Sequence, residues 1–244
     1  MKTISSIIQK VVLSDKTVRV KLLGDSITHG VGGTGFTQDG DVIVGNVRRN
    51  ASGYCWAKLF AEYMQSTHNC EIVNNACTGT TIEFILDNLD ALVDDHDDII
   101  LCAIGTNNRH QYKNCPKIDT KEEHMQKFYD NLITLHEKIR ARGKNVIFIS
   151  NIPAAAENEK DGEDYYRLFH MCDLNALYLK AAYNLKIEYI SLYNLIFRYC
   201  REKGIMIDSL LSDGLHPNDR GHFVIFELIV MALGLSPKPD GAAF

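Results

Sequence analysis

Short apolar runs alternate along the chain with longer segments in which apolar residues recur at helical spacing. Because the runs are brief and rich in β-branched residues, they indicate strands of a parallel sheet that helices cover on both faces. The predicted strands are Val18–Leu23, Glu71–Asn74, Asp98–Ile104, Asn145–Ile149 and Ile187–Ser191.

The longer segments predict helices between the strands, and this alternation is typical of βαβ units. Right-handed crossovers would place helices on both faces of the sheet. The expected fold class is α/β, a three-layer α/β/α sandwich around a central parallel sheet of about five strands. Two stretches, Gly30–Ser52 and Ala154–Asp164, follow neither period and are expected to be irregular. The predicted helices are Tyr54–Gln65, Ile82–Leu92, Lys121–Arg142, Tyr166–Tyr183, Leu192–Lys203 and Asp219–Leu233.

Length and composition suit one globular unit, since 244 residues with 45% hydrophobic content can bury a substantial core. Neither a repeat nor a Pro-, Gly- or Ser-rich linker divides the sequence, so we expect one domain over 1–244 with its core at about 18–233. The net charge is −5 and the basic residues are dispersed, which gives no electrostatic footprint for nucleic acid or a membrane surface. The expected partner is a small-molecule substrate, and the sequence does not disclose an oligomeric state.

Cellular location is predicted from what the sequence lacks. The N-terminal residues do not form the apolar segment and cleavage site of a secretory signal peptide, and no stretch approaches the ~18 apolar residues of a membrane span. We expect a cytoplasmic protein, with export left open if a leader has been removed. The seven cysteines include no C-x-x-C pair and fit reduced thiols.

Two motifs that could indicate a cofactor lack the context they need. Gly30–Gly35 spells G-x-G-x-x-G, but turn-forming residues follow it where a dinucleotide site requires a helix. The histidines of the second half form no H-E-x-x-H or similar ligand pair. We therefore expect neither a cofactor nor a metal.

Polar segments follow three successive predicted strands. Ser26 comes after the first, Asn74–Gly79 after the second and Gly105–Asn108 after the third. Ligands of open parallel sheets bind beyond the carboxyl ends of the strands, where such segments converge. The sequence therefore predicts one site at this edge of the sheet.

Ser26 is the candidate nucleophile of this site. It lies in Gly24-Asp25-Ser26, and the glycine permits a tight turn that would hold the serine hydroxyl at the sheet edge. Taken alone, Asp25 or Ser26 could equally cap a following helix. A serine nucleophile also requires a base that removes its proton.

His216 is the candidate base, with Asp213 as its partner. In Asp213-Gly214-Leu215-His216-Pro217, a carboxylate three residues before the imidazole can bind one ring nitrogen and leave the other to face Ser26. An ordinary turn before a helix would account for the same residues.

Acyl transfer further requires donors for the developing oxyanion, each worth roughly 2.7–4 kcal/mol of barrier stabilisation. Asn107 offers a side-chain amide directly after the third strand, although an Asx turn is an alternative role. The backbone N–H of Ser26 and one from Asn74–Gly79 would complete the oxyanion hole.

Taken together and in this order, the blocks resemble the SGNH hydrolases, also called GDSL-type lipases and esterases. The resemblance covers about Val18 to Leu233 and implies a flavodoxin-like α/β/α sandwich that hydrolyses esters without metal or cofactor. The glycine of the family's second block aligns with Ala76, which would keep a backbone donor for the oxyanion hole. The neighbouring residues Asp25, Thr28, Gly79 and Asn108 are the candidates for substrate binding.

The predicted reaction is removal of a small acyl group from an oxygen ester through an acyl-enzyme on Ser26. Acetyl on a sugar is the working hypothesis, since the Gly30–Ser52 loop is polar and the family often acts on such esters. An acyl-CoA thioesterase or lysophospholipase is the nearest enzymatic alternative. A small-molecule or carbohydrate-binding module that has lost activity is the alternative from another class.

Overall fold

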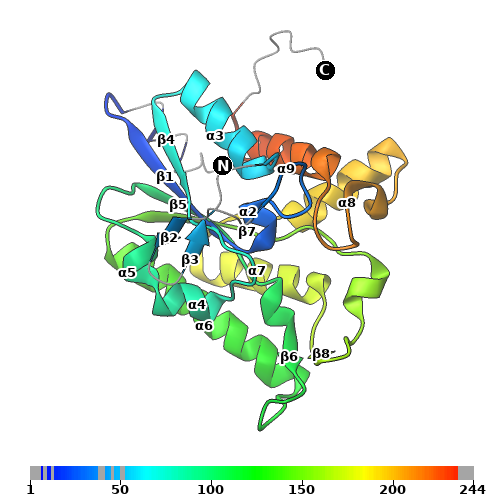
Figure 1. The fold of residues 1–244 in the computed structure, drawn as a ribbon. Helices are drawn as coiled ribbons and strands as arrows, with labels where there is room; N and C mark the ends of the chain where they lie inside the picture. The colour runs from blue at the N-terminus through cyan, green and yellow to red at the C-terminus, as the bar shows by residue number, and fades with distance from the viewer. Residues whose placement is uncertain are drawn as a thin grey trace.

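A five-stranded parallel sheet forms the centre of the protein in the computed structural model, which describes residues 7, 10, 11, 14–37, 42–44, 47–49 and 53–235 (Figure 1). The strand order is β4-β1-β5-β7-β9. The chain therefore adds β4 on one side of β1 and then crosses over to add β5, β7 and β9 on the other side. The predicted α/β sandwich is confirmed, with strand ends within two residues of the predicted ones. The strands are β1 (Val18–Gly24), β4 (Cys70–Asn74), β5 (Ile99–Ala103), β7 (Asn145–Ile149) and β9 (Glu188–Ile190).

Helices cover both faces of the sheet, as Figure 1 shows. Side chains alternate between the faces along each strand, so Leu22 packs in one core cluster and its neighbour Leu23 in the other. The first cluster is closed by α3 (Trp56–Thr67), α8 (Leu192–Lys203) and α9 (Asp219–Ala232). The second is closed by α4 (Ile82–Asp87), α5 (Leu89–Leu92), α6 (Lys121–Ala141) and α7 (Met171–Leu185).

Two predicted helices differ from the structure. The segment Ile82–Leu92 is divided at Asn88, whose backbone leaves the helical region and whose side chain donates to the Phe84 carbonyl at 2.9 Å. The segment Tyr166–Tyr183 becomes helical only at Met171, because Tyr165–Arg167 forms β8 and pairs with β6 (His110–Tyr112) in a separate antiparallel ribbon.

The two stretches expected to be irregular contain short elements. Gly30–Ser52 includes the antiparallel pair β2 (Val42–Val44) and β3 (Val47–Arg49), while residues 38–41, 45, 46 and 50–52 lie outside the described part of the chain. Ala154–Asp164 contains the 3-10 turn η2 (Ala156–Glu159). None of the described helices combines the length and apolar character that crossing a bilayer requires.

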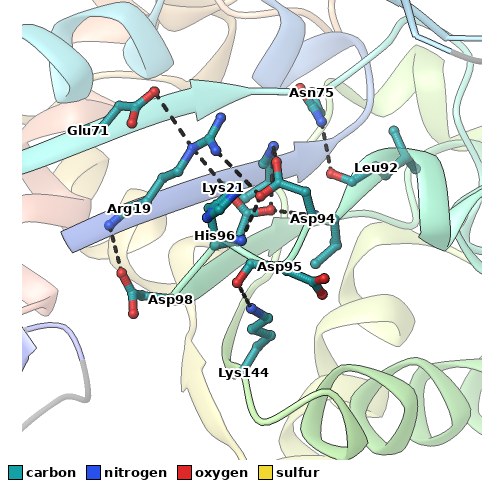
Figure 2. A network of polar contacts seen from close by, with 12 residues as sticks. Arg19, Lys21, Glu71, Asn75, Leu92, Asp94, Asp95, His96, Asp98 and Lys144 are labelled. Atoms are coloured by element: carbon teal, nitrogen blue, oxygen red, sulfur yellow. Dashed lines mark hydrogen bonds and ion pairs between the residues drawn. The ribbon is translucent and has the colours of Figure 1, made fainter. Parts of the chain in front are cut away.

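A charged network lies at the amino end of the sheet, opposite the edge that carries the polar loops (Figure 2). Lys21 on β1 is almost fully buried, and its ammonium group lies 3.3 Å from Asp94 and 3.4 Å from Asp97. Arg19, two residues earlier on the same face, also contacts both carboxylates. These pairings compensate the burial of charge in a strand that helices cover.

Candidate active site

Ser26 begins the one-turn helix α2 (Ser26–His29) directly after β1. Asp25 caps this helix, since its Oδ1 accepts a hydrogen bond from the Ile27 N–H at 3.1 Å. Gly24 is required for close packing, because a Cβ there would lie 2.5 Å from Thr28 Oγ1 and 2.8 Å from the Ala103 carbonyl oxygen. The turn thus holds the serine at the carboxyl end of β1.

Asp213 and His216 lie in a tight turn before α9. One carboxylate oxygen of Asp213 accepts from the backbone N–H groups of Leu215 and His216, at 3.0 and 2.8 Å. The other lies 2.7 Å from His216 Nδ1. The carboxylate therefore fixes both the turn and the orientation of the imidazole.

The hydroxyl Oγ of Ser26 lies 2.9 Å from His216 Nε2, so the three candidate catalytic side chains form a continuous hydrogen-bonded chain. With a proton on Nδ1 facing Asp213, Nε2 is the acceptor for the serine proton. Burial opposes ionisation of Asp213, but hydrogen bonds from the side chain and backbone of His216 outweigh it and lower the pKa of the carboxyl. Asp213 is thus ionised at neutral pH and stabilises a positive imidazolium.

Asn107 begins the 3-10 turn η1 (Asn107–Arg109) at the end of β5. Its Nδ2 donates to the Thr80 carbonyl at 2.9 Å, which uses one of the two amide hydrogens. Thr78, two residues before Thr80, donates from its backbone N–H to His29 Nδ1 at 3.2 Å. The loop around Gly79 is therefore held between the helix of Ser26 and Asn107.

The geometry corrects the expectation for Ala76. Its N–H is buried and donates to Asn74 Oδ1 at 3.0 Å, so it has no free hydrogen for an oxyanion. Gly79, three residues later, is exposed, and its N–H makes no hydrogen bond to the described residues. Its φ of +80° is a conformation that glycine adopts readily. The glycine at position 79 was the signal in the sequence, but the family's glycine was aligned with Ala76 instead.

Two of the four candidates for substrate binding are also corrected. Asp25 and Thr28 are 0% exposed and support the nucleophile helix from below, so neither can contact a substrate. The amide of Asn108 accepts from the Ile82 N–H at 3.0 Å and donates to Glu83 at 2.7 Å, which commits it to positioning α4. Gly79 is exposed, and both Gly79 and Asn108 border the cavity beside Asn107.

Asn151 is a supporting residue that the sequence analysis missed. Buried directly after β7, it donates from Nδ2 to Asp25 Oδ2 at 3.0 Å and also to Thr106 Oγ1, so it links the nucleophile turn to the Asn107 turn. Burial raises the pKa of Asp25 despite these hydrogen bonds. Asn151 follows the fourth predicted strand, so it lies at the same edge of the sheet as the other polar segments. This position could have identified Asn151 from the sequence.

The stretch Ala154–Glu159 connects the acid-base turn to η1. The Ala155 N–H donates to the Gly214 carbonyl at 2.8 Å, and Asn158 Nδ2 lies 3.3 Å from the Asp213 carbonyl. Glu159 lies 2.7 Å from Arg109, a guanidinium that is fully buried. Burial lowers the pKa of Arg109 to about 10, so it remains charged at neutral pH.

A cavity of about 280 Å³ extends from Gly79 and Asn107 toward α6 and the β6–β8 ribbon. Its lining combines polar and aromatic side chains. It is formed by Gly79, Thr81, Glu83, Asn107, Asn108, His110, Gln111, Tyr112, Cys115, His124 and Lys127.

Residues 22–223 match the GDSL-like lipase/acylhydrolase family. The chain belongs to this family. It is therefore a carboxylic ester hydrolase of the SGNH type, as the resemblance implied. A search of the curated proteins found no match for this GDSL-like acylhydrolase.

Several solved structures share the fold of this GDSL-like acylhydrolase at low sequence identity. The α/β hydrolase LAE5 from the metagenome of Lake Arreo has a TM-score of 0.65 at 20% identity, covering 90% of this chain and 96% of its own. The acetylxylan esterase Axe2 from Geobacillus stearothermophilus has a TM-score of 0.65 at 16% identity, with coverages of 91% and 96%. A lipase/acylhydrolase from Enterococcus faecalis has a TM-score of 0.63 at 21% identity, with coverages of 91% and 99%.

Proposed function

We propose that this ester hydrolase removes a small acyl group, acetyl in particular, from an oxygen ester on a carbohydrate by way of an acyl-enzyme on Ser26. The observation that carries the proposal is the chain from Ser26 Oγ through His216 to Asp213, with distances of 2.9 and 2.7 Å. Both distances lie in the range that proton transfer between a nucleophile and its base requires.

In the first half-reaction, a bond forms between Ser26 Oγ and the ester carbonyl carbon while the serine proton moves to His216 Nε2. The carbonyl electron pair moves onto oxygen and gives an oxyanion. Its donors are the second amide hydrogen of Asn107 and the backbone N–H groups of Ser26 and Gly79. Gly79 takes the place expected of Ala76, whose N–H is already bonded.

Collapse of the tetrahedral intermediate breaks the bond to the alcohol oxygen, which receives the proton from His216. In the second half-reaction, His216 removes a proton from water as the water attacks the acyl carbon. The bond to Ser26 then breaks, and the serine regains its proton. Asp213 remains ionised and holds the imidazole in place throughout.

Two observations support a small acyl group and a polar alcohol. The cavity beside Asn107 is lined by histidine, glutamine, lysine and glutamate side chains as well as one tyrosine, which is unfavourable for a long alkyl chain. A structural relative of this chain is an acetylxylan esterase.

The test is hydrolysis of p-nitrophenyl esters from acetate to palmitate by the wild type and by Ser26→Ala. We expect the acetate to react fastest and Ser26→Ala to lose at least about 1,000-fold in kcat. A preference for palmitate would contradict the small acyl group. Faster release from acetyl-CoA than from oxygen esters would favour the thioesterase, and an inactive wild type that still binds ligand would favour a binding module.

A further inference from the structure

The β6–β8 ribbon is joined to the proposed oxyanion residue without a break in the chain. Asn107 opens η1, and β6 starts directly after that turn. In the ribbon, His110 pairs with Arg167 and Tyr112 pairs with Tyr165, so these side chains share one face. His110, Gln111 and Tyr112 also line the cavity that begins at Asn107.

His110 has hydrogen-bonding groups that the described residues leave unused. Its ring lies between Tyr112 and Tyr165, at centroid distances of 5.3 and 4.8 Å, and neither ring nitrogen bonds to a described residue. Burial, together with the positive charges of Arg167 and Arg109, lowers the pKa of His110 to about 4. At neutral pH its imidazole therefore offers one N–H donor and one nitrogen acceptor.

The remaining lining is polar and close to neutral overall. Gln111 accepts from the Asp119 N–H at 2.8 Å through its oxygen, which leaves its amide hydrogens for another partner. Lys127 and Glu83 contribute opposite charges to the wall. Tyr112 is 56% exposed and presents its ring to solvent at the cavity.

We propose that this cavity is a subsite for one neutral, hydroxyl-bearing sugar ring of the ester substrate, with Tyr112 as the aromatic wall and His110 and Gln111 as hydrogen-bonding partners. The volume of about 280 Å³ lies just below the ~300–1,000 Å³ of sites for drug-sized ligands, which suits a single ring. An alkyl chain would leave the hydrogen-bonding groups of His110 and Gln111 desolvated and unpaired, which is unfavourable.

This subsite rests on the proposed function, so the first measurement is one that does not depend on turnover. Binding of acetylated xylotriose is measured by calorimetry on Ser26→Ala and on Ser26→Ala combined with Tyr112→Ala or with His110→Leu. We expect each added change to weaken binding about tenfold, equivalent to about 1.4 kcal/mol. Tyr183→Ala, in the same Ser26→Ala background, is the matched control, because Tyr183 is 78% exposed on α7 and lines no part of the cavity.

The second measurement is the ratio of kcat/KM for acetylated xylotriose to kcat/KM for p-nitrophenyl acetate, which carries no sugar. Tyr112→Ala and His110→Leu in the active enzyme should lower this ratio about tenfold, and Tyr183→Ala should not change it. Unchanged binding and an unchanged ratio would overturn the subsite while the esterase reaction stands. Sugar binding that depends on Tyr112, together with a wild type that hydrolyses neither ester, would uphold the subsite and overturn the proposed reaction.

Discussion

Asn107 and Asn108 are neighbours in the chain, but the structure uses their amides differently. Asn107 donates one amide hydrogen to the Thr80 carbonyl, and in the proposed reaction the other binds the oxyanion. Asn108 is 6% exposed and is bonded at both its oxygen and its nitrogen to α4. Substitution of each residue in turn therefore separates the proposed oxyanion contact from the structural contacts.

Asn107→Ala should lower kcat by about 100-fold or more through loss of an oxyanion donor, with a change in the free energy of unfolding near 1 kcal/mol. Asn108→Ala is the matched control and should cost about 2 kcal/mol of stability, because it leaves the Ile82 N–H without its acceptor. Ester hydrolysis and urea unfolding of both variants provide the check. Equal losses of kcat in the two would argue against Asn107 as a donor.

At the residue scale, the sequence allowed candidates to be named where chemistry dictates the residue type. Ser26, Asp213 and His216 could be named because a nucleophile, a base and a carboxylate must occur together, and the structure brings them into contact. Ala76 could not be judged, because whether a backbone N–H is free depends on a neighbouring side chain. The burial of Asp25 and Thr28 was likewise invisible without the packing above and below α2.

Among the elements, the strands and most helices could be predicted from the spacing of hydrophobic residues, because each of these elements is buried on one or both faces. The exceptions depended on long-range contacts. β8 exists only because β6 lies beside it, and the ordered segment Ala154–Glu159 is held by hydrogen bonds to the acid-base turn and to Arg109. No local period encodes such pairings.

The ion pair between Glu159 and Arg109 is expected to stabilise the connection between the acid-base turn and η1. Glu159→Ala leaves a fully buried guanidinium without its carboxylate and should destabilise the protein by about 3 kcal/mol. It should also lower kcat, because Asn158 beside it positions the backbone of Asp213.

Urea unfolding and ester hydrolysis of Glu159→Ala give the two readouts. Lys160→Ala is the control, since Lys160 is exposed and pairs only with Glu157 among the described residues. If Glu159→Ala matched Lys160→Ala in both measurements, the ion pair would have no such role.

At the scale of the whole molecule, the free energy of unfolding should depend on pH through histidines that the fold keeps neutral. His222 is fully buried, donates to the Val31 carbonyl at 3.2 Å and accepts from the Trp56 N–H at 3.4 Å. Burial lowers its pKa from 6.5 to about 4. Between these values the unfolded chain binds a proton that the folded chain excludes, so this contribution to stability is lost as the pH falls.

His222→Gln should remove that contribution, which amounts to about 3 kcal/mol between pH 7 and pH 4. The raised pKa values of Asp25 and Asp97 act in the opposite direction over part of this range, so the informative quantity is the difference between variant and wild type. Urea unfolding at several pH values measures it. A variant whose stability runs parallel to that of the wild type would show that His222 is not excluded from protonation.

Whether Ser26 carries the acyl group can be tested by peptide mapping with mass spectrometry after reaction with a fluorophosphonate. We expect one adduct, on the peptide that contains Ser26, with no adduct and no ester hydrolysis in Ser26→Ala. An adduct elsewhere, on Cys77 for example, or hydrolysis by Ser26→Ala at the wild-type rate, would contradict it.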